Sequence, residues 1–122
     1  MDDCIFCRIA RGELPARLVY ENEQVIAFDD ISPQAPVHVL IVPRTHHESL
    51  GDGVDAELAA ALLLAIPVVA EAAGVTRSGY RVIINTGPDS RQSVSHLHIH
   101  VLGGKPMSHR MLRFADEAET TR

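Results

Sequence analysis

The stretch that decides how this chain is understood covers residues 94–102 and reads Val94-Ser95-His96-Leu97-His98-Ile99-His100-Val101-Leu102. Side chains alternate between the two faces of a β-strand, so a strand here places all three imidazoles on one face. Imidazole can accept, donate or carry a proton near neutral pH. A row of three therefore indicates proton transfer, metal binding or anion binding. The alternative is a half-buried strand whose polar face is merely rich in histidine.

Length and composition limit what the rest of the chain can be. With 122 residues, of which 46% are hydrophobic and 22% charged, we expect one domain over residues 1–114 and a mobile acidic tail over 115–122. The net charge of −5 comes from 11 basic and 16 acidic residues, which argues against a nucleic-acid partner. A small anionic ligand remains possible, because a local group of N–H donors and imidazoles can outweigh a weak overall charge.

No segment for export or membrane insertion is apparent in the sequence. The chain does not start with a basic region followed by an apolar stretch. Its longest apolar stretch, residues 58–70, is too short to span a bilayer and contains Pro67. We therefore expect a cytoplasmic protein without a membrane partner.

Two cysteines, Cys4 and Cys7, are the only ones in the chain. A disulfide across so short a loop stabilises little, and a redox pair of the thioredoxin type would follow a strand. C-x-x-C is also half of a tetrahedral zinc site, which needs two further ligands. His46, His47 and the three alternating histidines are the candidates. The alternative is a pair of reduced thiols without a ligand.

The pattern of apolar residues, caps and turns predicts an α+β fold with a mostly antiparallel sheet. A short N-terminal helix is expected over 3–11, capped by Asp2 or Asp3, and one long helix over 55–73, closed by Gly74. Strands are expected over 17–20, 24–28, 37–42, 80–86 and 94–102.

The residues just before the histidines suit nucleophilic catalysis. An attacking imidazole must be neutral, with one nitrogen protonated and anchored and the other lone pair free. Gln92 offers an amide, Ser93 a hydroxyl and Asn85 both a donor and an acceptor for an anion such as phosphate. A phosphoryl group on histidine is itself a phosphoramidate, so exchanging one P–N bond for another is nearly balanced in energy. This chemistry favours P–N substrates.

Several motifs in the right order resemble the histidine triad family, whose signature is H-x-H-x-H followed by apolar residues. The matching segments are residues 30–36, 38–43, 92–94 and 96–104, which extend through most of the chain. The ending Val101-Leu102-Gly103-Gly104 resembles the Hint branch, the nucleoside phosphoramidases. The Fhit branch, dinucleoside polyphosphate hydrolases, typically has Pro-Arg after the triad. The resemblance also implies a homodimer.

The resemblance implies roles for individual residues. By position, His98 matches the nucleophile that forms the nucleotidyl intermediate, and His100 a partner that contacts the α-phosphate. His38 matches the histidine that supports proton movement around the nucleophile. Ser93 is expected to help protonate the leaving group and completes the catalytic set. The nucleotide contacts would comprise Asp30 and Ile31 for the ribose and base, Asn85, Gln92 and Ser93 for the phosphate and leaving group, and the rings of His98 and His100.

The resemblance also implies which residues complete the zinc site of the C-x-x-C pair. Bacterial members with this motif bind zinc through the two cysteines, a histidine in Pro-x-Thr-His and the first triad histidine. Here those positions are Cys4, Cys7, His46 and His96, which implies a structural Zn²⁺. His47 is then expected to be an exposed neighbour.

Two departures from the Hint pattern bear on specificity. Ser90-Arg91 stands where Gly-Gly is usual, and the chain after Gly104 lacks the Trp-Pro-Pro ending. The expected function is hydrolysis of purine nucleoside 5′-phosphoramidates, AMP or GMP derivatives, through a nucleotidyl-histidine intermediate. The alternatives are a dinucleoside polyphosphate hydrolase of the same family and a zinc-containing nucleotide-binding regulatory module with little turnover.

Overall fold

The computed structural model describes residues 3–116, so residues 117–122 of the predicted tail lie outside the described part. Within it, the chain forms a short helix, three strands, a long helix and two more strands, which confirms the predicted α+β class. Their bounds are α1 Ile5–Ala10, β1 Leu18–Glu21, β2 Val25–Asp29, β3 Val37–Pro43, α2 Ala56–Ala72, β4 Tyr80–Ile84 and β5 Ile99–Gly103.

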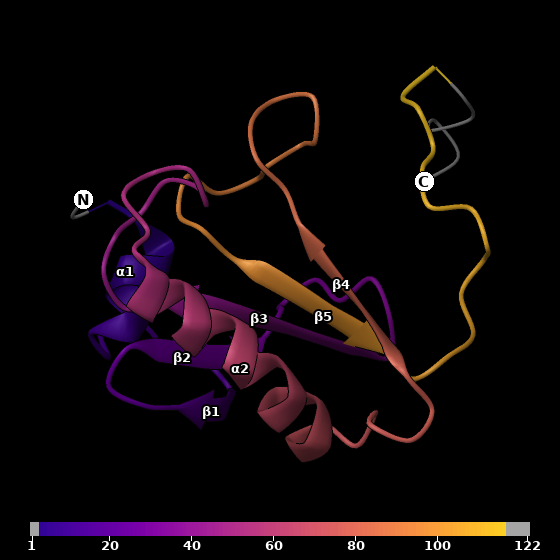
Figure 1. Cartoon of the computed structure of the whole chain (residues 1–122), viewed down its shortest axis with the longest axis horizontal. Coiled ribbons are helices and arrows are strands. Elements are labelled where there is room, and N and C mark those ends of the chain that lie inside the picture. The colour runs from indigo at the N-terminus through magenta and orange to yellow at the C-terminus, as the bar shows by residue number, and fades with distance from the viewer. Residues whose placement is uncertain (1–2, 117–122) are drawn as a thin grey trace.

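The strands form one sheet in the order β1-β2-β3-β5-β4, and every neighbouring pair is antiparallel. The strand that follows the alternating histidines, β5, therefore lies inside the sheet, between β3 and β4 (Figure 1). Ile99 pairs with Ile41 on one side and with Ile84 on the other. Because β5 has a neighbour on each side, the last histidine is held in a rigid part of the fold.

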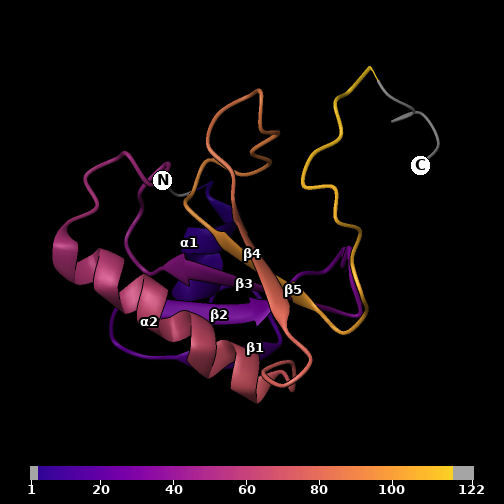
Figure 2. The same cartoon turned by 45° about the vertical axis from the view of Figure 1, so that its right-hand side comes forward.

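One helix covers each face of the sheet, with α2 on the near side and α1 behind it in Figures 1 and 2. The alternation along β2 shows how the faces divide, since Val25 and Ala27 pack towards α2 whereas Ile26 and Phe28 pack towards α1. The larger core, on the α2 side, consists of Val25, Ala27, Val39, Ile41, Leu58, Leu62, Ala65, Val69, Leu97, Ile99 and Val101. The smaller core consists of Phe6, Ile26, Phe28, Leu40 and Val42.

The strand predicted over 94–102 begins only at Ile99, so the prediction is wrong for the five residues before it. The ladder with β3 ends at the pair Ile41 and Ile99. Pro43, at the end of β3, has no N–H, and its carbonyl oxygen accepts a hydrogen bond from the His96 ring at 2.9 Å. At Pro43, the N–H that could extend the β3–β5 ladder is therefore absent, and the carbonyl that could do so already binds the His96 ring. The two strands 17–20 and 80–86 also differ from β1 and β4 at their ends.

The helix ends follow local chemistry, with one correction. Asp55 caps α2 by accepting from the Leu58 N–H at 2.9 Å, and Gly74 follows the helix with φ +78°, as predicted. The N-cap of α1 is Cys4, whose sulfur accepts from the Cys7 N–H at 3.4 Å, and not Asp2 or Asp3. The first cysteine therefore starts the helix that carries the second.

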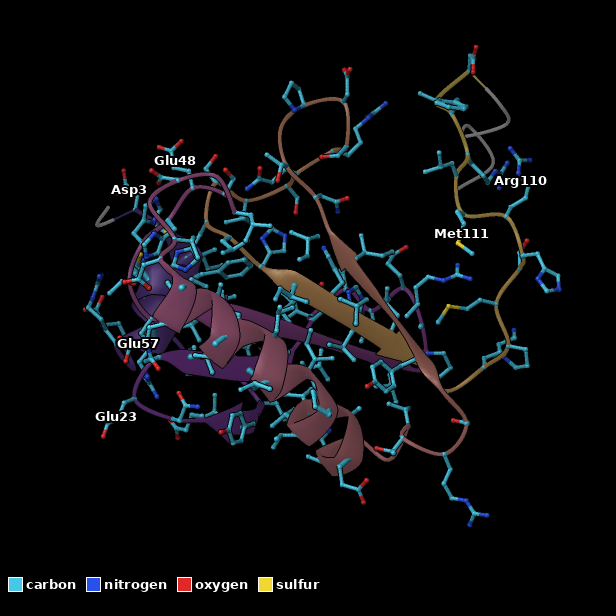
Figure 3. The ribbon with its side chains drawn as sticks, in the orientation of Figure 1. Asp3, Glu23, Glu48, Glu57, Arg110 and Met111 are labelled. Atoms are coloured by element: carbon cyan, nitrogen blue, oxygen red, sulfur yellow. The ribbon has the colours of Figure 1, made fainter. Side chains whose placement is uncertain are left out.

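After β5 the described chain leaves the sheet and continues over 105–116 without forming a helix or strand. Arg110 and Met111 lie on this segment, at a distance from the sheet (Figure 3). One hydrogen bond, from Arg81 Nη2 to the Ser108 carbonyl at 3.1 Å, ties it to β4. None of the described helices combines the length and apolar character that crossing a bilayer requires.

Candidate active site and metal centre

The ring of His98 is held in one tautomer by its own backbone neighbour. Its Nδ1 lies 2.7 Å from the His96 carbonyl oxygen, which can only accept, so Nδ1 carries the proton. In the neutral ring the Nε2 lone pair is then free. His98 is only 3% exposed, and the Phe6 ring packs against it edge-on with centroids 5.2 Å apart. This is the neutral, anchored imidazole that nucleophilic attack requires.

Two further histidines form a directed hydrogen-bond chain beside it. The Gln34 N–H donates to His38 Nδ1 at 3.0 Å, so His38 carries its proton on Nε2. That Nε2 lies 2.9 Å from His100 Nδ1, which must accept. The remaining donor, His100 Nε2–H, is buried and has no partner among the described residues. Since a buried donor without a partner is costly, its direction marks where an anionic or carbonyl oxygen of a ligand is expected.

Burial keeps these rings neutral. Burial and, to a lesser extent, the nearby His98 and His38 rings together lower the pKa of His100 to about 4. Burial also lowers the pKa of His38, although the Asp30 carboxylate, 3.5 Å from His38 Nε2, opposes this shift. At neutral pH both rings therefore keep the single proton on which the chain of donors and acceptors depends.

The low pKa of His100 predicts a loss of stability in acid. The group has a usual pKa of 6.5 and a folded value of about 4, so its contribution is complete above pH 6.5 and is lost as the pH falls towards 4. After allowing for the solvent around this half-buried ring, the loss is about 2 kcal/mol. We expect His100→Gln to flatten the slope of unfolding free energy against pH between 6.5 and 4. Denaturant unfolding at several pH values measures it.

The exposed histidine of the C-terminal segment gives the control. His109→Gln should leave the slope as it is in the unmodified protein. An unchanged slope in His100→Gln would mean that protonation of this ring does not oppose folding.

A cavity of about 380 Å³ opens beside the histidines. His98 and His100 line one part of it, together with Ser93 and Asp30. The remaining lining is mostly apolar and comes from α1, the loop after it, the sheet, the loop after β2 and the segment before β5: Ile5, Phe6, Ile9, Leu14, Pro15, Ala16, Phe28, Asp29, Ile31, Leu40 and Val94. An apolar slot with a few convergent polar groups is the usual form of a small-molecule site.

The predicted nucleotide contacts do not all meet in this cavity. Asp30 and Ser93 line it, and so does Ile31, whose side chain is 92% exposed at the rim. Asn85 follows the end of β4 and, like Gln92, is absent from the lining residues. The Gln92 amide instead connects loops: Oε1 accepts from the Gly87 N–H at 2.9 Å, and Nε2 donates to the carbonyl of Glu48 at 2.7 Å. For these two residues the contact with phosphate stays a prediction.

Arg91, the departure from the family's Gly-Gly, has φ +62°. Among the described residues other than glycine, Arg91 alone has a positive φ. This left-handed backbone conformation normally costs a residue with a side chain about 1 kcal/mol relative to glycine. The loop thus keeps the conformation that glycine favours, although it carries an arginine.

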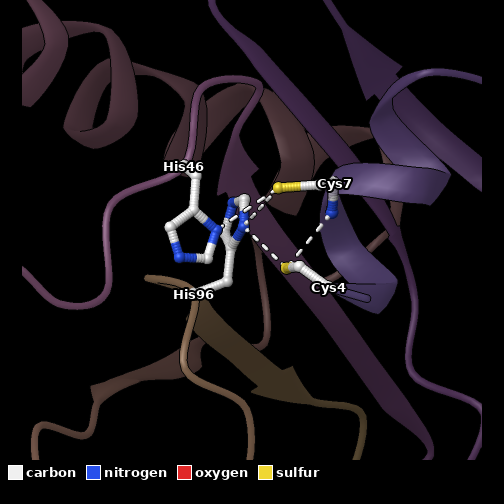
Figure 4. Close-up of side chains that lie close together, drawn as sticks. All are labelled: Cys4, Cys7, His46 and His96. Atoms are coloured by element: carbon white, nitrogen blue, oxygen red, sulfur yellow. Dashed lines mark hydrogen bonds between the residues drawn. The ribbon is translucent and has the colours of Figure 1, made fainter. Parts of the chain in front are cut away.

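The four sequence-predicted metal ligands come together. One ligand atom from each of Cys4, Cys7, His46 and His96 lies within 4.8 Å of the others. His96 Nδ1 is 3.3 Å from the Cys4 sulfur and 3.5 Å from that of Cys7, and His46 Nδ1 is 3.3 Å from the Cys7 sulfur. Tetrahedral zinc with ordinary bond lengths separates sulfur and nitrogen ligands by roughly 3.5 Å. Figure 4 shows the thiols of Cys4, at the N-cap of α1, and of Cys7, within α1, facing the two rings.

The surroundings also prepare His96 for a metal. Its Nε2–H donates to the Pro43 carbonyl at 2.9 Å, which leaves the Nδ1 lone pair directed at the thiols. Burial lowers the pKa of His96 to about 4, so the ring is neutral, as a ligand must be. His47 lies outside the group because its Nδ1 donates to the Asp52 carbonyl at 2.8 Å. It is half-buried, however, and not exposed as predicted.

The sequence analysis missed the groups that orient these side chains. Phe6 stands between the two cysteines and contacts the rings of both His96 and His98. Two further groups are backbone atoms, the Gln34 N–H and the Pro43 carbonyl. A phenylalanine inside a C-x-x-C motif was a usable signal, whereas backbone groups carry none in a sequence.

Comparison with known proteins gives a family match. The model of the HIT domain family matches residues 11–107. The chain is 44% identical over 109 residues to the purine nucleoside phosphoramidase of Escherichia coli (strain K12), covering 87% of this chain and 91% of that protein. It is 44% identical over 108 residues to the 14 kDa zinc-binding protein of Zea mays, covering 85% and 84%.

The fold has a solved counterpart in the crystal structure of a HIT family hydrolase from Legionella pneumophila. The two superpose with a TM-score of 0.83 at 42% sequence identity, covering 88% of this chain and 97% of that one. Both the sequence and the arrangement of strands and helices are thus similar to those of known proteins.

Proposed function

Because this chain belongs to the histidine triad (HIT) family, we propose that it hydrolyses purine nucleoside 5′-phosphoramidates through a nucleotidyl intermediate on His98. The observation that carries the proposal is the 2.7 Å hydrogen bond from His98 Nδ1 to the His96 carbonyl. It leaves the Nε2 lone pair free on a ring that lines a cavity of about 380 Å³. The similarity to a named phosphoramidase and to a HIT family hydrolase supports this choice.

The reaction divides into two exchanges at phosphorus. In the first, His98 Nε2 forms a bond to the α-phosphorus, the P–N bond to the amine breaks, and the amine leaves with a proton. In the second, water attacks the same phosphorus, loses a proton that replaces the one taken by the amine, and the bond to His98 breaks, which releases the nucleoside monophosphate and restores the neutral ring. The Nδ1 proton stays on the His98 ring and keeps its hydrogen bond to the His96 carbonyl oxygen. This hydrogen bond stabilises the positive charge on the substituted ring.

The chain through His38 and His100 supplies a donor for the phosphate. Because His38 donates to His100 Nδ1, the unpartnered His100 Nε2–H is fixed as a donor. A non-bridging oxygen of the α-phosphate would satisfy it. A donor already in place costs no reorganisation as charge develops in the transition state.

The cavity offers a carboxylate that suits the ribose of a nucleoside and an apolar lining that suits its base. The Asp30 carboxylate accepts from the Ser32 N–H at 2.8 Å, which holds one of its oxygens in place at the cavity. A carboxylate can accept from both ribose hydroxyls. The apolar lining beyond it, including Phe28 and Leu40, suits a purine ring.

The charges around the cavity favour an amine as leaving group. No lysine or arginine is among its described lining residues, whereas Asp29 and Asp30 are. A polyphosphate leaving group would therefore lack a cation, and a neutral or cationic amine would not need one. Ser93, at the same cavity, can help to deliver the proton that the departing nitrogen requires.

We expect kcat/KM for an adenosine 5′-phosphoramidate to exceed that for a diadenosine polyphosphate by at least about tenfold, or roughly 1.4 kcal/mol. Steady-state kinetics with both substrates on one preparation measures this ratio. An equal or reversed preference would assign the chain to polyphosphate hydrolysis. A preparation that binds AMP and cleaves neither substrate would favour the regulatory module.

The four residues Cys4, Cys7, His46 and His96 fit a structural zinc ion. Two thiolates and two neutral imidazoles are a common zinc donor set, and all four positions are used by protein, so no coordination site is left for substrate. When bound, zinc would link α1 to the loop after β3 and to the segment before β5. Its contribution is therefore to stability and to the placement of neighbouring residues.

A homodimer in the cytoplasm completes the proposal. Large apolar side chains of α2, Leu63 at 58% and Leu64 at 69%, are exposed, and Val82 and Ile83 are exposed on the edge strand β4. Exposed apolar side chains and an unpaired strand edge are each suited to contact with a second copy.

A further inference from the structure

The metal centre and the nucleophile share one residue. The His96 ring contributes Nδ1 to the metal-binding group, whereas its backbone carbonyl accepts the Nδ1–H of His98. The ring is fully buried and is held at its other nitrogen by Pro43. A shift of His96 would therefore move the oxygen that fixes the tautomer and direction of the His98 ring.

Phe6 makes a second connection between the same two sites. It lies in α1 between the metal-binding cysteines, and its ring centroid is 5.8 Å from that of His96 and 5.2 Å from that of His98. The edge-on contact limits rotation of the His98 ring. The position of Phe6 depends on α1, a helix of only six residues. So short a helix gains most of its order from tertiary contacts.

The segment that carries His96 and His98 has little regular structure of its own. It precedes β5 and lies outside the sheet ladder. The Leu97 N–H donates to the His47 carbonyl at 2.7 Å, and the Gln92 side chain donates to the Val94 carbonyl at 2.9 Å. Leu97 is buried in the core on the α2 side, and the His96 ring is held by the Pro43 carbonyl on one side and faces the other three ligands on the other. The placement of His96 therefore depends in part on the group of ligands around it.

We propose that occupancy of the Cys4, Cys7, His46 and His96 centre positions the nucleophile, through the His96 carbonyl and the Phe6 ring. Phe6 and His96 are positioning residues for His98. Loss of the metal therefore lowers turnover, although every residue that contacts the reacting phosphorus or the leaving group is still present. This inference rests on the proposed function for its kinetic consequence only. The orientation of the His98 ring can be measured without any substrate.

The adjacent histidines His46 and His47 provide a matched pair for the test. His46→Gln removes a ligand without altering His96 or His98, whereas His47→Gln alters a residue outside the group. With one zinc bound, ¹⁵N NMR of the His98 ring should show a single tautomer protonated at Nδ1. In His46→Gln, kept below its unfolding temperature, we expect a mixture of tautomers. Its kcat should fall by at least about tenfold with KM changed less than threefold.

Phe6→Leu tests the second connection in a protein that keeps all four ligands. We expect it to retain zinc and its circular dichroism spectrum, but to broaden or shift the His98 ring signals. Folded His46→Gln and Phe6→Leu with the His98 signals and kcat of the unmodified protein would overturn the inference. If the zinc-loaded protein cleaves no phosphoramidate, the proposed function fails, and the NMR comparison still decides this inference.

Discussion

Replacement of His98 by alanine is expected to abolish turnover of an adenosine 5′-phosphoramidate, lowering kcat/KM by at least about 10⁴-fold. In the proposed mechanism the ring supplies the atom that bonds to phosphorus, and none of the other described residues around the cavity offers an equivalent free imidazole nitrogen, since His100 Nδ1 accepts from His38. AMP binding should weaken by less than about tenfold, because Asp30, His100 and the apolar lining remain. Steady-state kinetics and calorimetric titration with AMP measure the two effects.

A smaller replacement separates chemistry from folding. His98→Gly leaves a space that free imidazole can enter, so added imidazole should restore part of the activity if the ring acts as nucleophile. His109→Ala, in the exposed C-terminal segment, is the control and should keep full activity. Near-normal turnover by His98→Ala would rule out the assigned mechanism. So would the absence of a covalent adduct when the unmodified protein is quenched during turnover.

Loss of a metal ligand is expected to produce the largest fall in stability. At the proposed centre, zinc would be held by four residues from three separate segments of the folded chain, so its binding free energy would add to the free energy of unfolding. Removing one ligand should weaken zinc binding by at least roughly 100-fold, which corresponds to about 2.7 kcal/mol of stability. We expect Cys4→Ser to lower Tm accordingly and to reduce bound zinc well below one ion per chain. Elemental analysis and thermal unfolding measure both.

The same pair of adjacent histidines controls this experiment. His46→Gln should behave like Cys4→Ser, whereas His47→Gln should retain zinc and lose only its contacts with Asp52 and Thr45. A chelator should reduce the Tm of the unmodified protein and of His47→Gln, and have little effect on His46→Gln. Purified protein without metal, and with a Tm that chelation leaves unchanged, would contradict the structural zinc site.

The sequence by itself determined the class of fold and most of the elements. The caps at Asp55 and Gly74 and the β-branched run before Pro43 are local signals, and they place α2 and β3 within one residue of their observed ends. The metal ligands were also readable in the sequence, but only through resemblance. Spacing alone left the partners of Cys4 and Cys7 open, because His46 and His96 lie far from them along the chain.

The alternation of the histidines correctly separated Leu97 and Ile99 from the rings of His98 and His100, but the strand predicted over 94–102, on which that separation was argued, is partly wrong. Leu97 and Ile99 do face the α2 core, while the His98 and His100 rings lie together, with centroids 5.0 Å apart. Yet His96 and His98 precede the strand. Periodicity records which side chains alternate, but whether a ladder forms depends on the partner strand. Here β3 ends in a proline whose carbonyl binds the His96 ring.

Only the tertiary structure decided which nitrogen of each ring is free. That choice depends on backbone groups, the His96 carbonyl for His98 and the Gln34 N–H for His38. Every residue carries such groups, so no sequence pattern distinguishes the ones that matter. The same holds for Gln92, whose amide is used to join loops, and for Phe6, which lies against the His98 ring. The sequence thus specifies which chemical groups are available, whereas folding fixes their direction, because direction arises from contacts between distant segments.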